Sequence, residues 1–187
     1  MLDKIGEFLR EDVKYSDSAR VLKRSVDIRV VLLGDQHPDT LYSMDSLAIS
    51  YSLDGKLAEA AELEEKVLEA RRRILGEEHP DTLTSMGNLA STYRIQGKLA
   101  EAVELQEKAL EARRRILGEE HPDTLTSMGN LAVTYENLGL VAEAMDLMSK
   151  SLAASKSQLG EAHPNTVKCQ EWLDLWTGGG SPVSTEI

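Results

Sequence analysis

The sequence contains a single cysteine, Cys169, among 187 residues. One cysteine cannot form an intramolecular disulfide, and it leaves a zinc site of the four-cysteine type without its ligands. Such scarcity is typical of proteins from a reducing, intracellular compartment.

Aromatic residues are also scarce, at 4% of the chain with one phenylalanine. Sandwiches, barrels and propellers usually depend on aromatic and β-branched residues. This chain instead depends on Leu, Ala, Glu and Arg, which favour helices. We therefore expect an all-helical fold.

Long apolar runs are missing as well. No stretch approaches the roughly 18 apolar residues of a membrane-spanning helix, and charges interrupt residues 1–13, so no signal peptide is expected. Lys and Arg number 21 against 32 Asp and Glu, a formal charge of −11. Because phosphate backbones and anionic membranes attract basic residues, neither a nucleic acid nor a membrane is an expected partner. The composition predicts a soluble, cytoplasmic protein, with an acidity that serves solubility or attracts a basic partner.

What the sequence does contain is a repeat of 42 residues without insertion or deletion. The tetrad His-Pro-Asp-Thr occupies residues 37–40, 79–82 and 121–124, and His-Pro-Asn-Thr occupies 163–166. Residues 68–90 are identical to residues 110–132. Such a period is the mark of a repeat architecture.

Each unit contains two helical patterns. In the unit that starts at Gly76, Pro80 suits the first position of a helix. Apolar residues then recur at spacings of three and four, as in one face of a helix, until Gly97. A second such stripe runs from Leu99 to Gly118. Because neither helix can bury its stripe alone, neighbouring hairpins are expected to stack into one core.

The repeat divides the chain into units with incomplete ends. A partial repeat is expected over residues 1–33, with a short helix around Ile5, Phe8 and Leu9 before a second helix over 16–33. The remaining segments are repeats at 34–75, 76–117 and 118–159, a capping helix at 160–176 and a disordered tail at 177–187. The total is about nine helices in a right-handed α-solenoid. A chain that opens on an incomplete repeat fits a fragment of a longer protein equally well.

The spacing Leu89-Ala90-x-x-Tyr93-x-x-x-Gly97-x-x-x-x-Ala102 resembles the tetratricopeptide repeat. The 42-residue length and the linker Leu-Gly-x-x-His-Pro-Asp-Thr resemble the branch found in kinesin light chains, nephrocystin-like proteins and the repeat tails of NTPase immune-type receptors. The family's common aromatic residue in the second helix is replaced here by Glu64, Gln106 and Met148. The stack should therefore depend more on Leu and Ala packing.

Two other repeat classes have a similar period. WD40 blades need four strands per unit, which these helix-forming segments oppose. HEAT repeats are helical hairpins of about this length, but the Leu-Ala-x-x-Tyr and Gly-x-x-x-x-Ala patterns disfavour them.

The sequence offers no catalytic, cofactor or metal site. The four histidines fall one per repeat, and stacked helices are about 10 Å apart, too far for zinc ligands at about 2 Å. Each histidine is instead expected to cap or pack at the end of its loop. The triplets Arg71–Arg73 and Arg113–Arg115 lie beside glutamates, so we interpret them as salt-bridged helix ends that complement the dipole. The glycines at 178–180 have no Lys and no following helix, so they form no phosphate loop.

The resemblance implies that the first helix of each unit lines an inner groove that holds a peptide. It also implies an asparagine just before the Leu-Ala pair that bonds the peptide main chain. That position is Asn88 and Asn130 here, with Ser46 in the earlier unit and Trp172 in the last helix. The expected groove residues are Tyr42, Asp45, Ser46, Ile49, Thr84, Asn88, Ser91, Arg94, Thr126, Asn130, Val133 and Asn137. The alternative is that the two asparagines only bond between neighbouring helices.

The sequence thus predicts a non-catalytic scaffold that binds a protein or peptide through this groove. A first alternative is a self-association module, in which arrays pack end to end or back to back. A second is an accessory domain of an enzyme whose catalytic part lies elsewhere.

Overall fold

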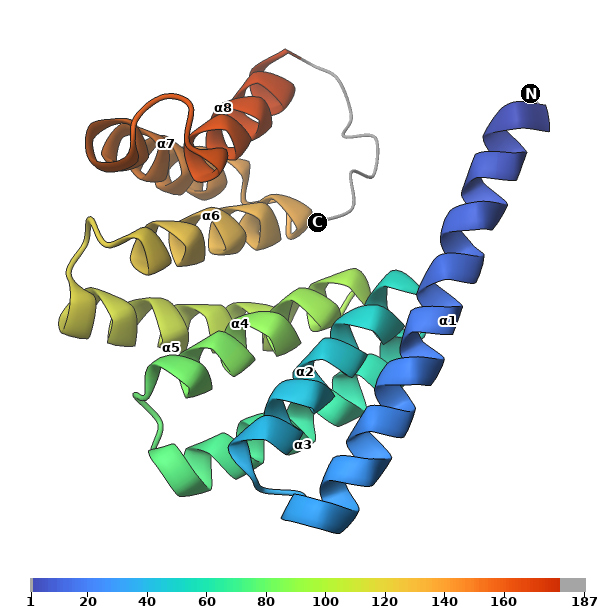
Figure 1. Ribbon diagram of the computed structural model, residues 1–187. Helices are drawn as coiled ribbons and strands as arrows, with labels where there is room; N and C mark the ends of the chain where they lie inside the picture. The colour runs from blue at the N-terminus through green and yellow to red at the C-terminus, as the bar shows by residue number, and fades with distance from the viewer. Residues whose placement is uncertain (1, 179–187) are drawn as a thin grey trace. The chain divides into compact units, whose positions relative to one another are not determined.

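Eight α-helices make up the described part of the chain, for which the structure is a computed structural model (Figure 1). It places the backbone of residues 2–178 and the side chains of residues 16–178. The helices are α1 (Leu2–Leu33), α2 (Pro38–Leu53), α3 (Leu57–Leu75), α4 (Pro80–Ile95), α5 (Leu99–Leu117), α6 (Pro122–Asn137), α7 (Val141–Leu159) and α8 (Pro164–Thr177). The all-α class is confirmed, whereas the tail expected from residue 177 lies outside the described residues from 179 onward.

The helices belong to two compact units, residues 1–97 with α1 to α4 and residues 98–187 with α5 to α8. In the first unit, α1 packs on α2, α2 on α3 and α3 on α4. In the second, α5 packs on α6, α6 on α7 and α7 on α8, and α6 also touches α8. Each helix therefore buries its apolar stripe against its neighbours in the chain, as in stacked hairpins.

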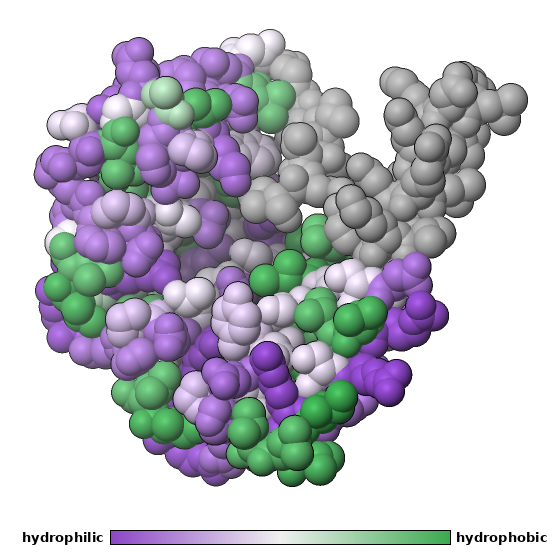
Figure 2. Space-filling model, in the orientation of Figure 1, coloured by the Kyte–Doolittle hydropathy of each residue, from purple (hydrophilic) through white to green (hydrophobic). Residues whose placement is uncertain are grey.

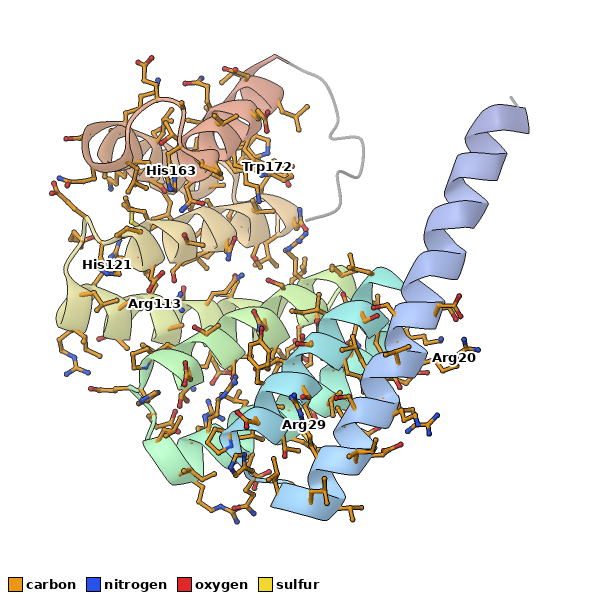
Figure 3. All side chains as sticks on the ribbon, in the orientation of Figure 1. Arg20, Arg29, Arg113, His121, His163 and Trp172 are labelled. Atoms are coloured by element: carbon orange, nitrogen blue, oxygen red, sulfur yellow. The ribbon has the colours of Figure 1, made fainter. Side chains whose placement is uncertain are left out.

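Helices α2, α4, α6 and α8 all begin at a His-Pro pair. The histidine is the N-cap, and its Nδ1 accepts a hydrogen bond from the backbone N–H two residues later, at 3.2 Å in all four cases. The proline follows at the first helical position, where it has no unpaired N–H. The expected capping role of the histidines is confirmed, and Figure 3 shows His121 and His163 at the starts of α6 and α8.

Helices α3, α5 and α7 end at glycines whose backbone is left-handed. Gly76 and Gly118 both have φ of 92°. Only glycine adopts this region without steric cost, so the chain can turn sharply into the next loop.

Small and aliphatic side chains fill the core. Ala48, Ala90 and Ala132 lie at the same repeat position on α2, α4 and α6, and each is fully buried. The adjacent leucines are 3–4% exposed. The expected dependence on Leu and Ala packing is confirmed, because most of the buried apolar side chains among the described residues are Leu and Ala. The buried central positions of α3, α5 and α7 hold Glu64, Gln106 and Met148.

Helix α1 departs from the repeat. The expectation of a separate short helix before residue 16 is wrong, because α1 runs without a break from Leu2 to Leu33. This accounts for eight helices in residues 2–178 rather than nine. In Figure 1 the first half of α1 extends beyond α2 and α3.

The reason for the unbroken helix lies at one residue. Gly55, Gly97 and Gly139 turn the chain between the two helices of a hairpin, with φ of 74–79°. The residue 42 positions before Gly55 is Val13. A β-branched residue strongly disfavours positive φ, so the turn does not form and the helix continues.

Candidate protein-binding face

The first four predicted groove residues lie on α2. Tyr42 is 68% exposed and Ile49 is 49% exposed. Ser46 is half-buried, and its hydroxyl donates to the Tyr42 carbonyl at 3.1 Å. Asp45 is largely covered, because it forms an ion pair with Arg71 of α3 at 2.6 Å. The carboxylate of Asp45 is therefore committed within the fold, while Tyr42 and Ile49 face outward.

Helix α4 carries the next four predicted residues. Thr84 is exposed, and Asn88, Ser91 and Arg94 are half-buried. The hydroxyls of Thr84 and Ser91 donate to backbone carbonyls four residues earlier, at 2.9 and 3.0 Å. Their donor capacity is thus used locally, and the Ser91 oxygen can still accept a hydrogen bond.

Helix α6 carries the last four predicted residues, and one of them is buried. Thr126 and Asn137 are exposed, and Asn130 is half-buried. Val133 is only 3% exposed, so its expected place in an open groove is wrong. It packs with Met148 of α7 and with side chains of α8, because α8 covers this part of α6.

Asn88 and Asn130 occupy the same position on α4 and α6. Within the described residues neither side-chain amide has a hydrogen-bond partner, and neither is fully buried. On α8 the position is taken by Trp172, whose ring lies 5.8 Å from that of Trp176 and packs against the core beside α6 (Figure 3).

Three arginines, Arg71 buried and Arg29 and Arg113 half-buried, link successive helices, and the sequence interpretation missed them. Arg71 is 8% exposed, and its Nη1 donates to Ser85 at 2.6 Å while Nη2 pairs with Asp45. Arg29 donates to Ser43 in the same way, and Arg113 donates to Ser127 at 2.5 Å.

Only part of the interpretation of the triplets is confirmed. Arg72 pairs with Glu77 and Arg114 pairs with Glu119, as expected for salt-bridged helix ends. The first arginine of each triplet instead joins one helix to the next. Figure 3 shows this for Arg113, which lies on α5 beside α6. The sequence did contain a sign of these links, because the arginines and their serine partners both repeat every 42 residues.

The first unit has two carboxyl groups near each other, Glu64, which is buried, and Asp45, which is largely covered. Burial raises the pKa of Glu64 to about 7, opposed by a hydrogen bond from Thr92 and supported by the charge of Asp45. Burial also raises the pKa of Asp45, although Arg71 acts to lower it. One oxygen of Glu64 has no hydrogen-bond partner among the described residues. These groups are enclosed, so they influence stability rather than an open site.

In the second unit, a cleft of about 490 Å³ lies between α5, α6 and α7. Its lining includes Glu107, Glu111, Glu143 and Asp146. The hydroxyl of Tyr135 donates to Glu107 at 2.6 Å, and burial together with this carboxylate raises the pKa of Tyr135 to about 12. The tyrosine is therefore a fixed hydrogen-bond donor and not a proton-transfer group at neutral pH.

Cys169 is the remaining candidate for a reactive side chain. It is 6% exposed, and burial raises the pKa of its thiol although Ser151 is a hydrogen-bond neighbour. Because the thiolate is the reactive form, this environment suppresses nucleophilic chemistry. The described part of the chain also contains no group of three or more His, Cys, Asp or Glu arranged to hold a metal ion.

Comparison with known proteins identifies the class. Two models of the tetratricopeptide repeat match, one over residues 65–115 and 87–157 and the other over residues 1–39 and 40–81. The chain belongs to the tetratricopeptide repeat family. Comparison with curated proteins gave no significant match.

Solved structures refine the comparison. The chain is similar to a putative kinesin light chain of nearly identical TPR-like repeats from Podosopora anserina, solved both in its original form and as a variant with one substitution. In both cases identity is 31%, covering 94% of this chain and 84% of the other, with TM-scores of 0.74 and 0.75. BtubC from P. vanneervenii shares the fold at 19% identity and a TM-score of 0.64, with 95% of each chain covered. The resemblance to kinesin light chain-type repeats is confirmed.

The residues that the structure describes include no helix with the length and apolar character needed to span a membrane.

Proposed function

We propose that this chain is a non-catalytic scaffold of the cytoplasm that binds extended peptide segments of a partner protein on the first helices of its hairpins, on α2 and α4 in the first unit and on α6 in the second. The observation that carries the proposal is the pair of available amides, Asn88 and Asn130. A side-chain amide offers both a donor and an acceptor, which matches the main chain of an extended peptide. Membership of a family of interaction scaffolds supports the same function.

The shape of α4 supports close approach of a ligand backbone. Gly87 lies beside Asn88, and a Cβ built there would meet no atom within 4 Å. The neighbouring Thr84 and Ser91 have short side chains with their donors already satisfied. The peptide main chain could therefore reach the amide of Asn88 without meeting bulky groups.

The distribution of reactive groups supports a binding role over a catalytic one. The Cys169 thiol is buried, and the four histidines use Nδ1 to cap helices. The charge of −11 disfavours nucleic acids and anionic membranes as partners.

A display library of random 15-residue peptides tests the proposal. A peptide selected on the wild-type chain should bind the Asn88→Ala, Asn130→Ala double variant at least about tenfold more weakly, since each lost hydrogen bond is worth about 1 kcal/mol. Isothermal titration calorimetry measures the affinity.

The matched control is the Glu62→Ala, Glu104→Ala double variant. These glutamates hold one repeat position on α3 and α5, and their side chains are 68% and 67% exposed. Each forms a surface ion pair, which contributes little to stability. Equal binding by the asparagine and glutamate variants would refute the role of the amides.

Self-association is the second candidate function. The observation that favours it is a set of exposed apolar side chains on α1, including Val21 and Ile28.

A further inference from the structure

Helix α1 has an apolar face that no other described helix covers. Val21 is 66% exposed and Ile28 is 50% exposed. The residues at the same repeat positions on α3 are Leu63, which is half-buried, and Ala70, which is 9% exposed. Those two are covered because α2, the first helix of their hairpin, packs on α3. Figure 2 shows hydrophobic side chains on the surface over the second half of α1.

The sequence contains a segment that matches the missing helix. Residues 2–12 align, 42 positions earlier, with residues 44–54 of α2 and its turn. Leu2, Ile5 and Leu9 then occupy the positions of three α2 side chains that pack in the core of the first unit. These counterparts are Met44, Leu47 and Tyr51.

That segment cannot cover α1 of its own chain while α1 is straight. With Val13 in place of the turn glycine, residues 2–12 continue the axis of α1 away from α2 and α3 (Figure 1). The same eleven residues that would complete the hairpin are thus presented outward, and the surface they would cover is left open.

The charged residues also support the packing of residues 2–12 on α1. Asp45 of α2 forms its ion pair with Arg71 of α3, the two helices of one hairpin. The residues 42 positions earlier are Asp3 and Arg29. A helix made of residues 2–12, laid on α1 as α2 lies on α3, would bring Asp3 to Arg29.

We infer that two copies of this chain form a dimer by exchanging residues 2–12, each copy laying this segment on α1 and α2 of the other. The exchange is reciprocal, because two straight antiparallel α1 helices that cross near residue 15 give both copies the same contacts. This arrangement is an isologous, domain-swapped interface, a common route to dimers from a hairpin that has lost its turn.

The mass in solution is the first test. Light scattering coupled to size exclusion should give twice the 20.6 kDa of one chain at all but the lowest concentrations. A mass of one chain throughout a wide concentration series would overturn the proposal.

Two substitutions at the hinge make the test specific. Val13→Gly restores the residue that turns the chain at positions 55, 97 and 139, so residues 2–12 should fold back and the dimer should become a monomer. Val13→Ala shortens the side chain but keeps the Cβ and favours the helix, so this control should remain a dimer. A dimer that persists unchanged in Val13→Gly would contradict the exchange.

Cross-linking identifies the contact itself. The two variants are Leu2→Cys and Ser25→Cys. Positions 2 and 25 align with Met44 and Val67, which belong to the same packed cluster, so the exchange should bring the two cysteines close together. Each variant is placed in a Cys169→Ser background, since serine is the residue found 42 positions earlier at Ser127. When the two variants are mixed, a short bismaleimide should join one chain of each kind. No mixed product, together with an intrachain link in the double-cysteine chain, would show a folded-back monomer and refute the exchange.

Discussion

Glu64 places a carboxyl group where the aligned helices have Gln106 and Met148. All three side chains are buried, at 3%, 3% and 1% exposed. A carboxylate in such a place loses its hydration and is only partly compensated by Thr92. Asp45 lies close by and is largely covered, but it has the guanidinium of Arg71 as a partner. Glu64 is therefore the less well satisfied of the two groups.

The stability of the first unit should depend on pH through Glu64. Its pKa is about 7 in the folded chain against 4.5 for an ordinary glutamate, so the folded state retains a proton that the unfolded state releases. The contribution to stability is fully present below about pH 4.5 and is lost as the pH rises to about 7. Glu64→Gln should therefore raise the free energy of unfolding by roughly 2–3 kcal/mol at pH 8 and change it little at pH 4.5. Urea unfolding at the two pH values measures this difference.

Glu62→Gln serves as the control, because it makes the same change on an exposed side chain of the same helix. It should leave the free energy of unfolding within about 0.5 kcal/mol at both pH values. An equal gain for Glu64→Gln at pH 4.5 and pH 8 would show that the ionisation of Glu64 is not the cause.

At the scale of the helix, the glycines serve two different purposes. Gly118 ends α5 with φ of 92°, a conformation that other residues adopt only at a cost. Gly87 lies inside α4, where glycine weakens a helix. Nothing in the packing of α4 requires it, because a Cβ at Gly87 would meet open space.

The same substitution should therefore have opposite effects at these two glycines. Gly87→Ala should raise the free energy of unfolding by about 0.5–1 kcal/mol, through its gain in helix propensity. Gly118→Ala should lower it by about 1 kcal/mol or more, because alanine is strained at positive φ. Guanidinium unfolding monitored by circular dichroism distinguishes the two. A loss of stability in Gly87→Ala would indicate that this face is packed rather than open.

The helices were predictable from the sequence because each boundary carries a local signal. His-Pro starts and glycine stops repeat every 42 residues, and the observed helix ends follow them within a residue or two. The break before residue 16 was not predictable from apolar spacing, since Ile5, Phe8 and Leu9 fit a helix either way. The absence of glycine at position 13 was the deciding feature. The division into repeats at residues 34, 76, 118 and 160 remains a prediction.

The candidate face was predictable only in part. Asn88 and Asn130 were found because a position repeats between α4 and α6. Val133 was misplaced because its exposure depends on α8, a helix distant in sequence that packs on α6. The pairing of Arg71 with Asp45 was missed because the two residues are 26 positions apart and lie on different helices, whereas helical periodicity relates only residues within one helix.

For the whole molecule, α8 closes the core of the second unit. It covers Ala132, Val133 and Met148 with Trp172, Leu173 and Trp176. A chain truncated after His163 should lose about 3 kcal/mol or more of unfolding free energy, because these apolar side chains would return to water. Differential scanning calorimetry should show the second unit melting at a lower temperature than in the full chain.

The control for this truncation ends the chain after Gly178, which leaves α8 in place. Its thermal unfolding should match that of the full chain. If the two truncations melted alike, α8 would contribute nothing to the core it covers.

The link between Arg71 and Ser85 recurs between Arg113 and Ser127, within the stretch that is identical in two units. Both partners of each link lie inside one period of the sequence. A gene duplication or deletion of 42 codons would therefore add or remove one arginine together with its serine partner. No new contact between helices would have to evolve. The array can lengthen or shorten in single steps during evolution, and near-identical neighbours are the expected record of such a recent event.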